Sequence, residues 1–177
     1  MMAAMRNLIG QWLTSIKHYQ LMCALLSSPD RLPHNPYVVL LTGFAYFLIG
    51  LFLVDAERSY ALVCAQITLE LLMLGLIAYV GLSWRKSMSR FLQTFSALLG
   101  TNVIITAVTI PAYRLSVGNG STNDSLLIYI TIAILVWNLA VLSLIFKRSF
   151  DISTHLSAII SFSYFLIYQI TVFWFLS

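Results

Sequence analysis

Five stretches of predominantly apolar residues follow one another with only short polar connections, and this spacing constrains the fold more than any other feature. A helix needs about 20 apolar residues to cross a hydrocarbon layer about 30 Å thick. Inside that layer each backbone amide must find its hydrogen bond within the segment, which favours helices for stretches of this length. The sequence therefore predicts an all-α polytopic membrane protein with five transmembrane helices, over residues 37–54, 60–84, 92–112, 126–146 and 156–176.

The composition argues against a soluble domain. Apolar residues make up 60% of the chain and charged residues only 9%, whereas soluble domains are about 45–50% apolar and about 25% charged. The net charge of +4 is spread thinly along the sequence, and a nucleic-acid-binding protein would concentrate it in a patch. We therefore expect membrane lipids around the helices and no nucleic-acid partner.

The positions of the basic residues predict an orientation. Cytoplasmic connections in membrane proteins are enriched in Lys and Arg. With five spans, eight of the ten basic residues fall on the side of the N-terminus, and only Arg58 and Arg114 fall on the other. We expect a cytoplasmic N-terminus, a C-terminus on the opposite side, and a bacterial inner (cytoplasmic) membrane as the location.

Residues 1–36 are predicted to be a cytoplasmic segment that begins with an amphipathic helix. Apolar residues recur there at three- and four-residue steps from Met5 to Cys23, which is the spacing of one helix face. Two placements fit this pattern. The helix lies in the membrane interface with Trp12 among the headgroups, or it packs against the cytoplasmic end of the bundle. Pro29, Pro33 and Pro36 then lead the chain into the first span.

Polar residues recur near the middle of the predicted spans. Glu70 lies near the centre of the second span, with Gln66 one turn before it. The same depth is reached by three amides in the later spans, namely Asn102, Asn138 and Gln169, and by Thr42 and Tyr46 in the first.

These residues admit two interpretations. An ionisable group inside a span is costly and is by default a functional candidate, so one hypothesis is a midplane polar cluster in which Glu70 takes up and releases a proton. The other is a set of interhelical hydrogen bonds that hold the bundle together. In that case Glu70 is protonated, because burial disfavours the charged carboxylate.

The usual groups of catalytic and metal-binding residues are missing from the pattern. His18, His34 and His155 are scattered at or outside the predicted membrane surface, and none has a second His or Cys at ligand spacing. Cys23 and Cys64 are too few for a disulfide framework. We therefore predict no catalytic residue, no metal, no cofactor and no enzymatic activity.

Three motifs carry a resemblance to a known family. They are LLSSPDRLPHNPY before the first span, FLQTFSALLG at the start of the third, and ILVWNLAVLSLIFKRSFDISTHLSAIISF across the fourth and fifth. Together they are similar to bacterial members of the Yip-type (Ypt/Rab-interacting protein) family. That resemblance implies a small five-span protein with a cytoplasmic N-terminus and no defined activity. The link of eukaryotic members to Rab-type GTPases goes with a long cytoplasmic N-terminal region, so we do not expect it here.

The sequence thus predicts a non-enzymatic integral membrane protein with a scaffolding or accessory role, which binds a membrane-protein partner or itself as a homo-oligomer. The alternative is a small transporter, channel or lipid-binding subunit that uses the midplane polar cluster around Glu70.

Overall fold

The computed structural model describes residues 2–52, 59–118 and 124–176, with side chains at 6–52, 59–111 and 128–174. Within these residues the chain is helical and contains no strand. The elements are α1 (Met2–Cys23), η1 (Pro29–Arg31), α2 (Pro36–Leu51), α3 (Tyr60–Trp84), η2 (Met88–Arg90), α4 (Phe91–Gly118), α5 (Asp124–Phe150) and α6 (Thr154–Leu176).

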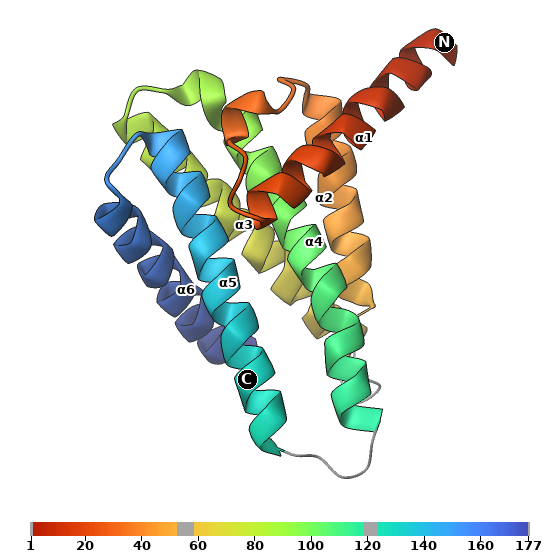
Figure 1. Cartoon of the computed structure of the whole chain (residues 1–177), viewed down its shortest axis with the longest axis vertical. Coiled ribbons are helices and arrows are strands. Elements are labelled where there is room, and N and C mark those ends of the chain that lie inside the picture. Colours follow the sequence, from red (N-terminus) through yellow and green to blue (C-terminus); the bar gives the residue numbers. More distant parts are fainter. Residues whose placement is uncertain (1, 53–58, 119–123, 177) are drawn as a thin grey trace.

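Helix α4 is the centre of the bundle. Helices α2 to α6 run alongside one another, and α1 crosses one end of them (Figure 1). α4 packs against α1, α2, α3 and α5, whereas α6 lies at the edge against α5 and α3. Residues 96–102 of α4 are buried without a break. Seven consecutive residues cover all sides of a helix, so neighbours surround α4 on every side at this level.

Four helices have the length and apolarity to cross a membrane, namely α3, α4, α5 and α6. The prediction of an all-helical, membrane-type chain is therefore confirmed. α2 has 16 residues, which span only about 24 Å, and it ends at Leu51 instead of continuing to residue 54. Because α2 is short for a span, the count of five spans stays a prediction.

The third and fourth predicted spans are longer than expected. The third predicted span ends at residue 112, directly after Pro111, but α4 continues through this proline to Gly118, so the chain stays helical for six residues beyond the predicted span. Proline removes one hydrogen bond of the helix, and a single lost bond does not end one as long as α4. α5 runs on to Phe150 and takes Lys147 and Arg148 into its last turn, where the helix dipole favours positive charge.

Helices α1, α3 and α5 end in the same way. A residue with positive φ follows each of them, namely Leu25 (63°), Lys86 (53°) and Asp151 (53°). After α3, the amide of Ser87 donates to the carbonyl of Leu82 at 2.9 Å. This closes a helix end whose carbonyls would otherwise lack partners, so short connections suffice at this end of the bundle.

The second half of α1 is built into the bundle. The hydroxyl of Tyr19 lies 2.6 Å from Ser96 Oγ and 3.3 Å from Thr42 Oγ1. Trp137 Nε1 donates to the carbonyl of Cys23 at 2.8 Å. Of the two placements expected for this helix, packing against the bundle describes residues 15–23. The interfacial placement is not confirmed, and the first half of α1 extends past the edge of the bundle (Figure 1).

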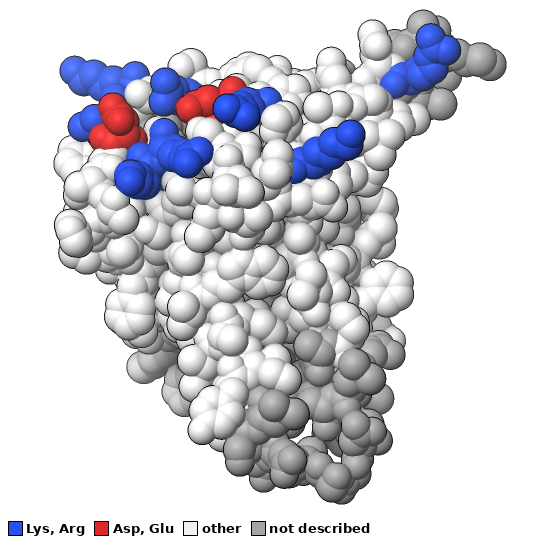
Figure 2. Space-filling model, viewed as in Figure 1, with Lys and Arg blue, Asp and Glu red and all other residues white. Residues whose placement is uncertain are grey.

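Basic side chains gather at one end of the molecule. Figure 2 shows Lys and Arg along the end where α1 and the connections α3–α4 and α5–α6 lie, above a face without visible charge. Arg90 and Asp30 form an ion pair there at 3.7 Å, and Arg85 Nη2 donates to the carbonyl of Asp151 at 3.2 Å. The two basic residues expected on the opposite side, Arg58 and Arg114, lie outside the described side chains.

Gly100 permits the close approach of α1 to α4, and its replacement tests that contact. A Cβ atom at Gly100 would overlap the ring of Tyr19, whereas one at Gly43 would only touch Leu99 Cδ1 at 3.7 Å. We expect Gly100→Ala to lower the free energy of unfolding by about 1–3 kcal/mol through overpacking. Gly43→Ala should be neutral or gain up to about 1 kcal/mol from helix propensity. Thermal unfolding in detergent measures both, and equal stability of the two variants would contradict the docking of α1.

Candidate polar cavity

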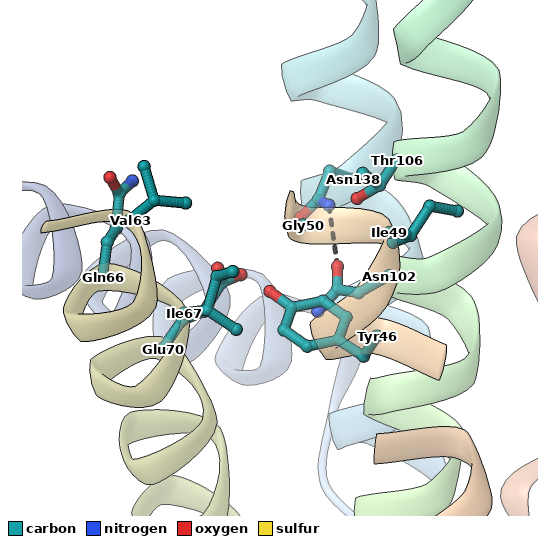
Figure 3. A pocket seen from close by; sticks show the side chains of 10 residues that line it. All are labelled: Tyr46, Ile49, Gly50, Val63, Gln66, Ile67, Glu70, Asn102, Thr106 and Asn138. Atoms are coloured by element: carbon teal, nitrogen blue, oxygen red, sulfur yellow. Dashed lines mark hydrogen bonds between the residues drawn. The ribbon is translucent and has the colours of Figure 1, made fainter. Parts of the chain in front are cut away.

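A cavity of about 230 Å³ lies between α2, α3, α4 and α5. Figure 3 shows its lining, with the side chains of α3 on one side and those of α2, α4 and α5 on the other. The residues are Tyr46, Ile49, Gly50, Val63, Gln66, Ile67, Glu70, Asn102, Thr106 and Asn138. Because a water molecule occupies about 30 Å³, the space suits about seven waters or one small solute.

Helix α3 supplies the acidic side of the cavity. Val63, Gln66, Ile67 and Glu70 line it together, because residues three and four apart share one helix face. This face turns towards α2 and α4, while the opposite face of α3 is exposed and apolar apart from Thr68 and the helix ends. The rotation of α3 therefore places the one carboxyl of the predicted spans in the interior.

Two tyrosines contact or face Glu70. The hydroxyl of Tyr168 on α6 donates to Glu70 Oε2 at 3.4 Å, and Gln66 Nε2 donates to the same hydroxyl at 3.4 Å. The hydroxyl of Tyr46 on α2 is directed towards Glu70 from across the cavity (Figure 3). Both distances are long for hydrogen bonds. A carboxylate offers about four acceptor positions, so Glu70 keeps acceptor capacity for a bound group.

Two amides form the opposite wall. Asn138 Nδ2 on α5 donates to Asn102 Oδ1 on α4 at 3.1 Å (Figure 3). An Asn side chain has two donor hydrogens and two acceptor lone pairs. The pair therefore keeps free donors and acceptors at the cavity wall, with Thr106 one turn further along α4.

No basic side chain of the described residues lines the cavity. A charged carboxyl in an apolar interior is costly unless something neutralises it. Glu70 must then carry a proton or face a cation, and the nearby hydroxyl and amide oxygens are ligands of hard cations. Among the described residues no three His, Cys, Asp or Glu side chains come close enough to hold a metal ion together.

Four of the five residues predicted for the midplane cluster meet at this cavity: Gln66, Glu70, Asn102 and Asn138. The fifth, Gln169, does not, because it is exposed on the outer side of α6. Its neighbour Tyr168 faces inwards instead. Sequence reasoning missed Tyr168, since depth along a span says nothing about the direction in which a side chain points.

Comparison of the chain with protein-family models, with curated proteins and with solved structures finds no match. The structure by itself defines a class: the described residues are all-helical, with four helices able to span a membrane and a polar cavity among them. The resemblance to the Yip-type family stays a prediction from the sequence motifs.

The Asn102–Asn138 hydrogen bond is testable by a double-mutant cycle. We expect Asn102→Leu and Asn138→Leu each to lower stability, because each leaves the other amide without its partner. The double variant should lose less than the sum, with a coupling of about 0.6 kcal/mol and at most about 1.7 kcal/mol, as is typical of such bonds in membranes. Unfolding of the four proteins in the same detergent measures the coupling, and additive losses would contradict the bond.

Proposed function

We propose that the chain is an integral membrane protein that binds a small polar solute in the cavity around Glu70, as a transporter, channel or lipid-binding subunit would. The observation that carries the proposal is the placement of Glu70, whose carboxyl lines a cavity together with amides from two further helices. Interhelical hydrogen bonds alone would not require such a space, since well-packed interiors contain few voids of this size.

The solute that fits best is a small cation or a cationic amine. Glu70 is the only carboxyl among the described residues that line the cavity, and no basic side chain among them balances it. A bound cation would neutralise the carboxylate, and the oxygens of Asn138 and Tyr46 would supply further ligands. A proton taken up by Glu70 would neutralise the same carboxylate and compete with the cation.

Replacing Glu70 by Gln tests this proposal, because the change removes the charge and keeps the shape. We would record the thermal unfolding of the purified full chain with Li⁺, Na⁺, K⁺, methylammonium and choline. A ligand present at 100 times its dissociation constant adds about 2.7 kcal/mol of stability. We expect such a shift for one of these cations with the wild type and none with Glu70→Gln.

The matched control is Thr68→Val on the same helix. Thr68 is exposed, and its hydroxyl donates a hydrogen bond only to the carbonyl of Cys64 in the same helix, at 2.7 Å. This variant should therefore keep the full shift in thermal stability. Absence of any shift in the wild type, or an equal shift in Glu70→Gln, would contradict a cation site at the cavity.

We further propose that α2 to α6 all cross the bilayer and that the basic end faces the cytoplasm, in a bacterial inner membrane. The support is the alignment of α2 with the four longer helices (Figure 1) and the rule that Lys and Arg stay on the cytoplasmic side. A locally thinned bilayer accommodates a helix as short as α2.

Cysteine labelling in intact cells tests this topology. We expect Ser177→Cys to react with a membrane-impermeant maleimide from outside, and Lys17→Cys, exposed on α1, to react only after permeabilisation, because five crossings by α2 to α6 place them on opposite sides. The parent protein would carry Cys64→Ala. Labelling of both sites from the same side would show an even number of crossings and would exclude the five-span arrangement.

A second candidate function is the scaffolding or accessory role of a Yip-type protein, without enzymatic activity. One observation favours it, namely the exposed amide of Gln169 on the outer side of α6. A polar side chain facing lipid indicates a surface that another protein covers.

A further inference from the structure

Helix α6 carries two rows of side chains on nearly opposite faces. The inner row is buried or half-buried against α5 and α3 and consists of Ser157, Ser161, Tyr164 and Tyr168. The outer row, which we call the α6 stripe, is exposed. It consists of Ile159 (62% exposed), Phe162 (52%), Leu166 (44%), Gln169 and Phe173 (70%).

The spacing of the α6 stripe is that of a helix–helix seam. Its members follow at steps of three, four, three and four residues, and side chains at this alternation form the contact line of two helices that cross at about 20°. The inner row has the same alternation and is already covered, for example where Ser157 Oγ lies 3.0 Å from Ser143 Oγ of α5. The stripe has the pattern of a packed face but no partner among the described helices.

Gln169 distinguishes this stripe from a lipid-facing surface. The hydroxyl of an exposed Ser or Thr can donate a hydrogen bond to the carbonyl one turn earlier in its own helix, as those of Thr68 and Thr171 do. The amide of Gln169 forms no hydrogen bond with any described residue, although it lies between Leu166 and Phe173 inside a helix able to span a membrane. An unpaired amide in hydrocarbon costs several kcal/mol as an order of magnitude, so a partner for it stabilises the protein.

We propose that the α6 stripe binds the α6 stripe of a second copy of this chain, with the two Gln169 amides hydrogen-bonded to each other. Two copies inserted in the same orientation are related by a two-fold axis along the membrane normal, so each residue of the seam meets its own counterpart at the same depth. An amide suits this position because it offers both a donor and an acceptor. A carboxylate or an ammonium group would meet its own charge there.

This inference rests on the accessory role proposed above and supplies its partner, and it is independent of the cavity around Glu70. Disulfide crosslinking of the full chain in native membranes tests it. The parent protein carries Cys64→Ala and keeps Cys23, because burial raises the pKa of the Cys23 thiol to about 11 and leaves it largely unreactive near neutral pH. Leu166→Cys lies on the stripe, and Ile167→Cys is its control, since Ile167 is more exposed than Leu166 but points about 100° away around the helix.

We expect Leu166→Cys and Phe162→Cys to form disulfide-linked dimers of twice the chain mass under mild oxidation, and Ile167→Cys to stay monomeric. Crosslinking of Ile167→Cys at the same rate as Leu166→Cys would overturn the proposal. A stripe cysteine linked to a protein of another mass would also overturn it, while leaving the accessory role in place.

A second measurement probes Gln169 itself. In lipid nanodiscs or mild detergent, we expect Gln169→Leu to raise the dissociation constant of the dimer by about threefold to tenfold, which corresponds to the usual strength of hydrogen bonds between membrane helices. Gln169→Asn keeps a self-complementary amide and should retain more of the affinity. A wild type that is monomeric at all concentrations, or a Gln169→Leu dimer as tight as the wild type, would overturn the role of this residue.

Discussion

The complete burial of the middle of α4 is the constraint on which the rest of the structure depends. Residues 96–102 have neighbours on all sides, and α1 and α5 meet α4 there through small or polar groups. Gly100 lies against the ring of Tyr19, Ser96 bonds its hydroxyl, and Asn102 accepts from Asn138. In a membrane, helices associate through close packing and interhelical hydrogen bonds, because the hydrophobic effect does not drive them together in lipid. The polar groups therefore gather where helices meet.

The same constraint produces the cavity. Beside the tightly packed level of α4, Glu70 and Gln66 of α3 and Tyr46 of α2 line a space, with the Tyr46 hydroxyl directed towards Glu70 (Figure 3). The bundle thus combines a close contact around Gly100 with a polar opening within the next two turns of α4, at Asn102 and Thr106. A rigid wall next to a cavity is the arrangement that holds binding groups in place.

The sequence predicted some helix bounds and placements correctly and missed others, for physical reasons. The bounds of α3 agree with the predicted 60–84, because hydropathy over a long window reports burial in an apolar medium directly. The helical continuation of α4 through Pro111 was missed, since proline weakens a helix locally while the rest of a long helix persists. α1 was left with two placements, and only its contacts with Ser96 and Thr42 distinguish them.

The amino-acid sequence by itself predicted a helical chain with five apolar spans, and amides and one carboxyl near their middle. Among the described residues, four helices have the length and apolarity of membrane spans. Only the tertiary structure decided which of these groups meet. In a span that is apolar all round, periodicity does not indicate the inward face. Tyr168 and Gln169 are adjacent in sequence and about 100° apart around the helix. Packing against α3 and α5 turns the first towards Glu70 and leaves the second on the outer surface.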